Sequence, residues 1–307
     1  MKGAIFSLVL LVLALSGLGF VLYAYTPGEL QELSVEILKP ALPESNASST
    51  LKQFTPNMRF SHNRISYYYK TDCSEAKRET MKEAFDILAS EVSEISFYET
   101  VKSDADISIS CSETDLETKK STFVAGEGGP SEFLNFTPYS LIVKGEILLY
   151  KSLSENCDYP VVQLHELLHV LGYEHINKKQ SILYEYFDCK QRIDNDIITH
   201  LESLYSVEPK SELSFSELSA EKSGIYLDFE ASVTNTGLIS SEKTEIEVSS
   251  GNKKENFELG LIEPGISKTI TIKNFRLASR SSTQVSFKIL TPTPEYDIQD
   301  NIANAEI

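Results

Sequence analysis

Three histidines and a glutamate lie close together in one stretch, His165-Glu-Leu-Leu-His-Val-Leu-Gly-Tyr-Glu-His175. On a helix of 3.6 residues per turn, His165 and His169 lie one turn apart on the same face, so both imidazoles can bind one metal ion. Gly172 can take the left-handed conformation that ends a helix, and the turn can bring His175 back as a third ligand. Three neutral nitrogens leave one coordination position open, which predicts a single catalytic Zn²⁺.

Glu166 follows the first of these histidines and should lie beside the open position. There its carboxylate can take a proton from an attacking water and pass it to a leaving amine, as general base and then general acid. The alternative is a pair of surface histidines on an amphipathic helix, a common origin of a bare H-E-x-x-H match. The chain has 5 histidines, and three of them stand in this register, which favours the metal site. His62 and His200 have no metal spacing to the motif and are expected to be ordinary surface or satisfied core histidines. Glu174 is expected to be solvated rather than catalytic.

The segments around the motif predict a mixed sheet with helices packed on it. The motif's own helix is predicted to start at Asp158, with Pro160 in its first turn, where a missing N–H costs nothing. Apolar stripes and alternations predict strands at 64–69, 96–101 and 106–111, a strand or hairpin at 141–150, and helices at 75–92 and 194–205. Gly126 to Pro130 reads as a flexible loop, and Gly145 as a bend or bulge.

Beyond residue 206 the pattern changes to short alternating strands with glycine and proline turns. Alternation is clearest from Leu227 to Val233 and from Val285 to Ile289. The stretches from Asn235 to Gly237 and from Glu263 to Gly265 read as turns. This predicts a β-sandwich over residues 207–307, with a strand-like end from Tyr296.

Composition limits the class of protein and of partner. The 307 residues suffice for one large or two ordinary domains, and 41% hydrophobic with 24% charged residues is typical of a globular chain. The formal net charge of -17 would repel nucleic acid and anionic membrane surfaces, so we expect neither as a partner. The only membrane contact expected is through the N-terminus.

After Lys2 the chain runs without charge from Gly3 to Tyr25. Such a segment is either a secretory signal or a membrane-spanning helix. Its length exceeds the roughly 7–15 residues of a signal core, which favours an uncleaved anchor over residues 1–26, while small residues around Gly17 keep cleavage as the alternative. Residues 27–58 read as a proline-containing stalk. The chain is therefore expected to be exported, either membrane-anchored with extracellular domains or secreted.

The cysteine count is even. Cys73, Cys111, Cys157 and Cys189 include no C-x-x-C pair, which argues against a cysteine-rich zinc site. Two disulfides are expected in an exported protein, and three pairings are formally available. We predict Cys73 with Cys111 and Cys157 with Cys189, so that the second bridge ties the entry of the active helix to the segment beyond His175.

The motif from His165 to His175, and its spacing to Ser181-Ile-Leu-Tyr184, resembles the zinc signature of the metzincin metallopeptidases, in the matrixin branch. The resemblance spans residues 59–206 and implies an α+β catalytic domain with a mixed twisted sheet and three helices. In that family a methionine lies in a tight turn beneath the zinc, and Leu183 stands in its place here. Tyr184 either lines the substrate pocket or packs in the turn. No cysteine-switch motif is present, and no acidic loop matches a recognisable calcium site, so neither zymogen control nor calcium is expected.

The C-terminal part, from about residue 213, resembles the immunoglobulin-like CARDB modules of exported prokaryotic, particularly archaeal, proteins. Val233-Thr-Asn-Thr-Gly237, Leu261-Ile-Glu-Pro-Gly265 and Asp300-Asn-Ile-Ala-Asn304 carry this similarity. Together the two resemblances imply a zinc-dependent endopeptidase that hydrolyses extracellular or cell-surface proteins. The alternative is a non-catalytic surface protein that keeps the peptidase scaffold and binds a cell-surface partner through its sandwich.

Overall fold

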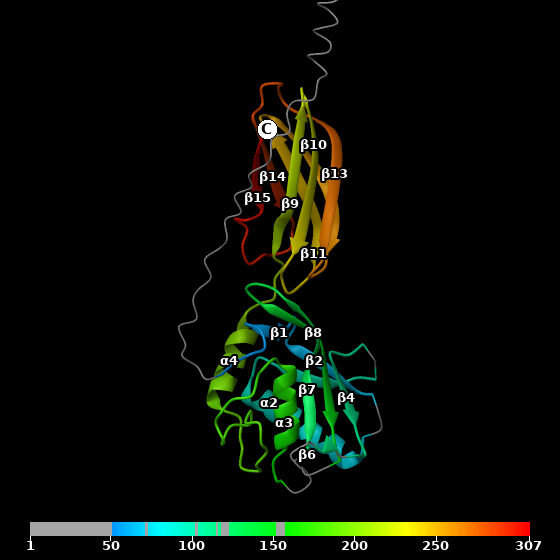
Figure 1. Ribbon diagram of the computed structural model, residues 1–307, viewed down its shortest axis with the longest axis vertical. Helices are drawn as coiled ribbons and strands as arrows, with labels where there is room; N and C mark the ends of the chain where they lie inside the picture. Colours follow the sequence, from blue (N-terminus) through cyan, green and yellow to red (C-terminus); the bar gives the residue numbers. More distant parts are fainter. Residues whose placement is uncertain (1–50, 71–72, 102–103, 115, 118–122, 152–156) are drawn as a thin grey trace, which may run out of the picture. The chain divides into compact units, whose positions relative to one another are not determined.

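The computed structural model describes residues 51–307, except residues 71–72, 102–103, 115, 118–122 and 152–156 (Figure 1). The described chain forms two compact units. The N-terminal unit runs to Lys210 and includes Gly237–Ile239, and the C-terminal unit contains the rest of the chain from Ser211. Each unit has its own buried hydrophobic cluster, so each is described separately.

The N-terminal unit is built on a mixed sheet with strand order β1-β8-β4-β2-β3, in which β7 pairs with β8. The pairs along this order are parallel, and β7 is antiparallel to β8. The strands are β1 (Met58–Phe60), β2 (Arg64–Tyr69), β3 (Ser96–Glu99), β4 (Ile107–Cys111), β7 (Gly126–Asn135) and β8 (Ser140–Leu149). Two short strands, β5 (Leu116–Glu117) and β6 (Phe123–Val124), pair antiparallel with each other in a separate sheet.

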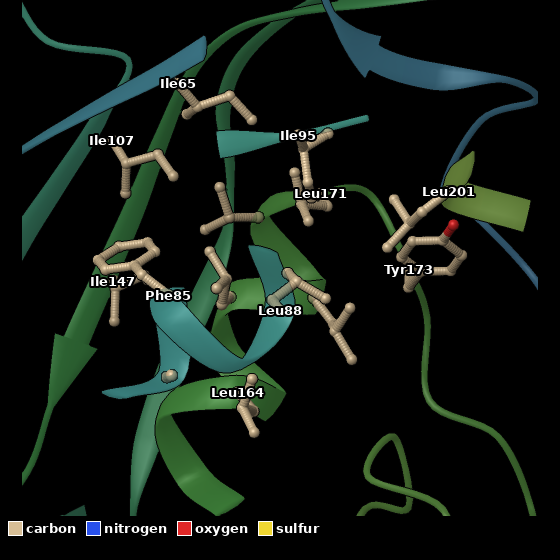
Figure 2. Packing of buried hydrophobic residues seen from close by; sticks show 14 of the residues in the cluster. Ile65, Phe85, Leu88, Ile95, Ile107, Ile147, Leu164, Leu171, Tyr173 and Leu201 are labelled. Carbon is tan, nitrogen blue, oxygen red and sulfur yellow. The ribbon is translucent and has the colours of Figure 1, made fainter. Parts of the chain in front are cut away.

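Three helices accompany this sheet: α2 (Glu75–Glu91), α3 (Val161–Val170) and α4 (Asn195–Ser206). The apolar stripe of α2 packs on the sheet, where the ring of Phe85 stacks on Tyr67 with centroids 4.1 Å apart. Figure 2 shows side chains from the sheet and from all three helices gathered in one core: Ile65, Phe85, Leu88, Ile107, Ile147, Leu164 and Leu201. The predicted mixed sheet with three helices is confirmed.

Two local predictions in this unit are wrong. Gly126–Pro130 is the first half of strand β7 rather than a flexible loop. Its glycines are explained by the close approach of α3, which composition alone cannot distinguish from flexibility. Helix α3 begins at Val161, three residues later than Asp158, and Pro160 is its N-cap. Gly145 is also a close-approach glycine, because a Cβ there would lie 2.4 Å from Val170 Cγ1.

The C-terminal unit contains two antiparallel sheets, ordered β13-β10-β9 and β12-β11-β14-β15. The strands are β9 (Leu213–Ser223), β10 (Tyr226–Asn235), β11 (Ser241–Ser250), β12 (Lys253–Ile262), β13 (Ser267–Arg276), β14 (Gln284–Leu290) and β15 (Ile302–Glu306). Alternate residues of both sheets fill one core, among them Phe229 and Phe287, whose centroids lie 5.2 Å apart. The predicted strand-like end is confirmed only from Ile302, because 296–301 is irregular.

No helix among the described residues is both long and apolar enough to cross a bilayer. The predicted anchor or signal at 1–26, and the stalk as far as residue 50, lie outside the described residues.

Candidate metal centre

The histidine motif lies on α3 and on the turn that ends it. After the C-cap Leu171, Gly172 takes a φ of +93°. The N–H of Gly172 donates to His169 O (2.9 Å) and that of Tyr173 donates to Leu168 O (3.1 Å). This pair of bonds is the Schellman motif, which needs a residue tolerant of positive φ at that position. The turn reverses the chain and places His175 opposite the helix.

The three imidazoles converge through their Nε2 atoms. His165 and His169 Nε2 lie 2.9 Å apart, and His175 Nε2 lies 3.1 Å from each of them. Among the described residues, this is the one group of three metal-ligating side chains whose donor atoms lie within 4.8 Å of one another. The sequence-predicted ligands are therefore brought together.

Backbone carbonyls fix the orientation of two of these rings. His165 Nδ1 lies 2.6 Å from Ile182 O, and His169 Nδ1 lies 2.6 Å from Tyr173 O. A carbonyl oxygen only accepts hydrogen bonds, so each Nδ1 carries the proton and each neutral ring presents an Nε2 lone pair. Lone pairs that face each other at about 3 Å need a cation between them, and carbonyl-bound histidines of this kind are typical metal ligands. The donor set therefore fits a metal ion.

Both helical histidines are held in the neutral form that binds a metal. Burial, with the charge of His169, lowers the pKa of His165 to about 3. Burial lowers the pKa of His169 to about 4. At neutral pH both Nε2 atoms are therefore unprotonated, and no proton has to be displaced before a metal ion binds.

Glu166 lies in the same cleft and is only 5% exposed. The cleft has a volume of about 900 Å³ and is lined by the three histidines, by residues 124–128 next to and within β7, and by residues 184–187. Burial and the charge of Glu127 raise the pKa of Glu166 to about 8. A carboxyl group that lines a water-accessible cleft is placed to exchange a proton with a water molecule there.

Residues 59–206 match the family model of the matrixins. The match begins in β1 and ends at the last residue of α4, so it covers the sheet, the three helices and the histidine cluster. The matrixin-like part of the chain is thus the N-terminal unit, and the family supports a metallopeptidase hydrolase in general.

The other comparisons add less. A search of curated proteins finds no match. Among solved structures, the chain is similar to the crystal structure of a CARDB domain from Pyrococcus furiosus in complex with di-metal ions, with 15% identity and a TM-score of 0.28, over 32% of this chain and 87% of that chain. A similarity of this size does not establish a fold, so the architecture of the C-terminal unit rests on its own strands and core.

The matrixin-like domain holds Glu166 against the start of β7. A Cβ built on Gly126 would lie 2.8 Å from Glu166 Oε1, and a Cβ built on Gly128 would lie 2.4 Å from Glu166 O. The strand therefore touches both the side chain and the backbone of the residue between the two helical ligands. Sequence reasoning missed this contact, since nothing local links residues 126–128 to Glu166.

Replacing Gly128 by alanine should therefore destabilise the domain. The new Cβ would meet backbone atoms of Glu166, which cannot rotate away, so β7 or α3 must shift at a cost of about 1–3 kcal/mol. The free energy of unfolding in urea measures this loss. Gly129→Ala is the matched control, because a Cβ at Gly129 has no heavy atom within 4 Å. Equal losses for the two variants would contradict the proposed close approach.

Leu183 lies in a tight turn after the third histidine. Tyr184 N–H donates to Ser181 O (3.2 Å), Leu183 N–H donates to Ser181 Oγ (3.1 Å), and Leu183 is 0% exposed within the core. The same turn presents Ile182 O to His165 Nδ1. Tyr184 is half-buried and lines the cleft. Leu183 is thus fully packed, and its turn holds His165 in orientation.

Two other residues of the cleft were missed from the sequence. Phe54 lines it from the end of the predicted stalk, and its N–H donates to Gly172 O (2.8 Å). Gln191 is buried at the far wall, where its Nε2 donates to Tyr186 O (2.8 Å) and Lys179 O (3.3 Å). Gln191 therefore holds together the loop that forms one wall of the cleft.

Disulfides join Cys73 to Cys111 and Cys157 to Cys189, the two predicted pairings. The second pair links the residues just before α3 to the loop that carries Gln191. Disulfides are typical of an extracellular or other oxidising environment.

The remaining histidines lie outside the cluster. His62 is exposed, and its Nε2 lies 3.0 Å from Asp106 Oδ2. His200 Nδ1 lies 2.7 Å from the hydroxyl of Tyr173, the residue whose carbonyl orients His169. His200 thus contacts the residue that orients His169. Its position in the sequence does not reveal this role. Glu174, expected to be solvated, is half-buried and lines the cleft.

Proposed function

We propose that this protein is a zinc-dependent endopeptidase that cleaves extracellular or cell-surface proteins. The observation that carries the proposal is the convergence of three Nε2 atoms within 3.1 Å, beside a buried carboxyl group in one open cleft. His165, His169 and His175 would hold the ion, with Ile182 O and Tyr173 O fixing two of the rings. Leu183 would take the place of the family methionine.

In this proposal the zinc ion and Glu166 have separate roles in peptide hydrolysis. Zinc in this position would supply Lewis-acid polarisation of the scissile carbonyl and lower the pKa of a water molecule. Glu166 would remove a proton from the attacking water and deliver it to the nitrogen of the leaving amine.

Strand β7 supports a peptide as the substrate. Among the described strands β7 pairs only with β8, and its first residues line the cleft. The other edge of such a strand offers backbone N–H and C=O groups to an extended chain, which is the usual way that a peptide is added to a sheet. A peptide aligned there would pass over Gly126 and Gly128, and so over Glu166.

The test uses the full-length protein and a library of quenched fluorescent peptides blocked at both ends. We expect cleavage at internal bonds, loss of cleavage after treatment with 1,10-phenanthroline, and recovery with one equivalent of Zn²⁺. Because neither peptide end is free, hydrolysis identifies an endopeptidase. Recovery that needs no added metal would contradict the assignment.

The second candidate function is the non-catalytic surface protein. The replacement of the family methionine by Leu183 favours it, and the presence of Glu166 favours catalysis, because a scaffold needs no base. Metal content separates the two. Less than about half an equivalent of zinc in protein purified without chelator, together with no peptide cleavage, would support the scaffold.

We further propose that the C-terminal unit is an immunoglobulin-like, CARDB-like module that contacts a cell-surface partner, and that residues 1–26 anchor the protein with both units outside the cell. Seven strands in two sheets around one core suit such a module. The paired cysteines suit export. The intact mass of the mature protein tests the anchor, since loss of the N-terminal residues would indicate a cleaved signal instead.

A further inference from the structure

The C-terminal unit contains a group of acidic side chains that the histidine site does not involve. Glu212 precedes β9, and Glu295, Asp297 and Asp300 lie in the irregular segment before β15. We call these four residues, together with Asn301, the acidic loop cluster. Glu212 is only 6% exposed and Asn301 only 4% exposed, so the cluster is not a solvated surface patch.

Hydrogen bonds hold the cluster in one arrangement. Glu212 Oε2 accepts from the N–H groups of Tyr296 (3.0 Å) and Asp297 (2.9 Å). Glu295 Oε2 accepts from Leu213 N–H (2.9 Å), and Glu295 Oε1 accepts from Asn301 Nδ2 (2.9 Å). The segment at 295–301 and the start of β9 are therefore joined through two carboxylates, in a preformed geometry that does not depend on a ligand.

Two oxygen atoms of the cluster are left without a partner. Asp300 Oδ1 and Asn301 Oδ1 are buried, and neither accepts a hydrogen bond from any residue that the structure describes. The Asn301 amide points into the cluster, since its Nδ2 donates to Glu295. A buried oxygen is normally satisfied by a donor, a water or a cation. Each of these two oxygens therefore lacks the donor, water or cation that a buried oxygen normally has.

Burial and neighbouring carboxylates raise the pKa values of three carboxyl groups in the cluster. Burial and the charges of Asp300 and Glu295 raise the pKa of Glu212 to about 7, and burial and Asp297 raise that of Asp300 to about 6. Burial and the charges of Asp300 and Asp297 also raise the pKa of Glu295. Lys243 and Lys288 line the same pocket as Glu295 and Asn301, but neither lysine contributes to these three pKa shifts.

We propose that the acidic loop cluster is a Ca²⁺ site, in which Asp300 Oδ1 and Asn301 Oδ1 bind the ion beside Glu295. Carboxylate and amide oxygens without any nitrogen or sulfur donor are the ligands of a hard cation. An irregular loop suits the flexible coordination of Ca²⁺ better than the strict octahedron of Mg²⁺. This site was not expected from the sequence, because Glu212, which fixes the loop, is distant from it along the chain.

The geometry also limits the affinity. Among the described residues, no three of these carboxylates bring oxygens within 4.8 Å of one another, so at most two of them bind the ion directly. The amide oxygen, loop carbonyls and water would complete the coordination. We therefore expect a Kd for Ca²⁺ of about 10⁻⁴–10⁻³ M, the range found for extracellular modules, because the site has few charged ligands.

The test measures Ca²⁺ binding by calorimetry, and the melting temperature, on the full-length protein loaded with one equivalent of Zn²⁺. At pH 7.5 we expect one Ca²⁺ bound beyond the zinc, a rise in melting temperature of roughly 5 °C in 10 mM CaCl₂, and a smaller rise in 10 mM MgCl₂. Asp300→Asn should weaken Ca²⁺ binding at least about 10-fold, and Glu295→Gln, which keeps an acceptor for Asn301, should do the same. The exposed Glu258→Gln on β12 is the matched control and should bind Ca²⁺ as the wild type does.

Comparing the melting temperatures of Asp300→Asn and the wild type, with and without Ca²⁺, distinguishes loss of Ca²⁺ binding from misfolding of the variant. Without Ca²⁺, Asp300→Asn should melt no lower than the wild type, because it removes one of several mutually repelling carboxylates. With Ca²⁺ it should melt lower. If Ca²⁺ does not raise the melting temperature of the wild type, or if the two proteins melt in the same order with and without Ca²⁺, the proposal is overturned.

Discussion

Replacing Glu166 by alanine should leave one equivalent of zinc bound and lower kcat for peptide hydrolysis by at least about 10²–10⁴-fold. The histidine rings are oriented by Ile182 O and Tyr173 O rather than by Glu166, so the ion should stay. What is lost is the one buried carboxyl group in the cleft that can receive the water proton. Metal content by mass spectrometry and kcat for a blocked peptide are measured on the same preparation.

Two further variants show what a loss of activity means. Glu79→Ala, at an exposed position on α2, changes the same residue type away from the cleft and should keep full activity. Glu166→Gln keeps the size of the side chain and should be almost as inactive as Glu166→Ala, because an amide cannot take the proton. Undiminished hydrolysis by Glu166→Ala would remove Glu166 from the base role. Loss of zinc would instead show a structural role.

Those parts of the site that are local in sequence could be predicted, because helix geometry alone fixes them. His165, Glu166 and His169 share one helix, and Gly172 has the one conformation that lets His175 return. The strands and helices with clean periodicity, such as β2 and α2, were predicted for the same reason. Each of these inferences needed only the backbone repeat and the apolar pattern.

Features that depend on contacts between distant segments could not be predicted. Gly126 and Gly128 looked like a flexible loop because the residue that requires them small, Glu166, is about forty positions away. Phe54 belongs to a segment whose composition suggested a stalk, yet it lines the cleft. A glycine or an aromatic residue does not encode its partner, so only the fold shows which role it has.

Removing zinc should destabilise the N-terminal unit by a large amount. Without a cation, three Nε2 lone pairs face one another at 2.9–3.1 Å, held there by the helix, the Schellman turn and two carbonyls. An ion present at about 1,000 times its Kd contributes about 4 kcal/mol, which for a unit of this size is a melting shift of about 8–16 °C. Treatment with 1,10-phenanthroline in excess CaCl₂ removes zinc while leaving any calcium in place, and calorimetry records the shift.

The histidine variants decide whether this shift comes from the cluster. His169→Ala should melt near the chelated wild type and show almost no further shift with phenanthroline, since two imidazoles hold zinc far more weakly than three. His62→Ala is the matched control, because His62 lies in the same unit but pairs with Asp106 outside the cluster. Whatever the melting temperature of His62→Ala before chelation, phenanthroline should lower it by as much as it lowers that of the wild type. An equal shift in melting temperature with phenanthroline in both variants would mean that the metal binds elsewhere. The close approach of the three Nε2 atoms would then have to be explained by protons shared between them.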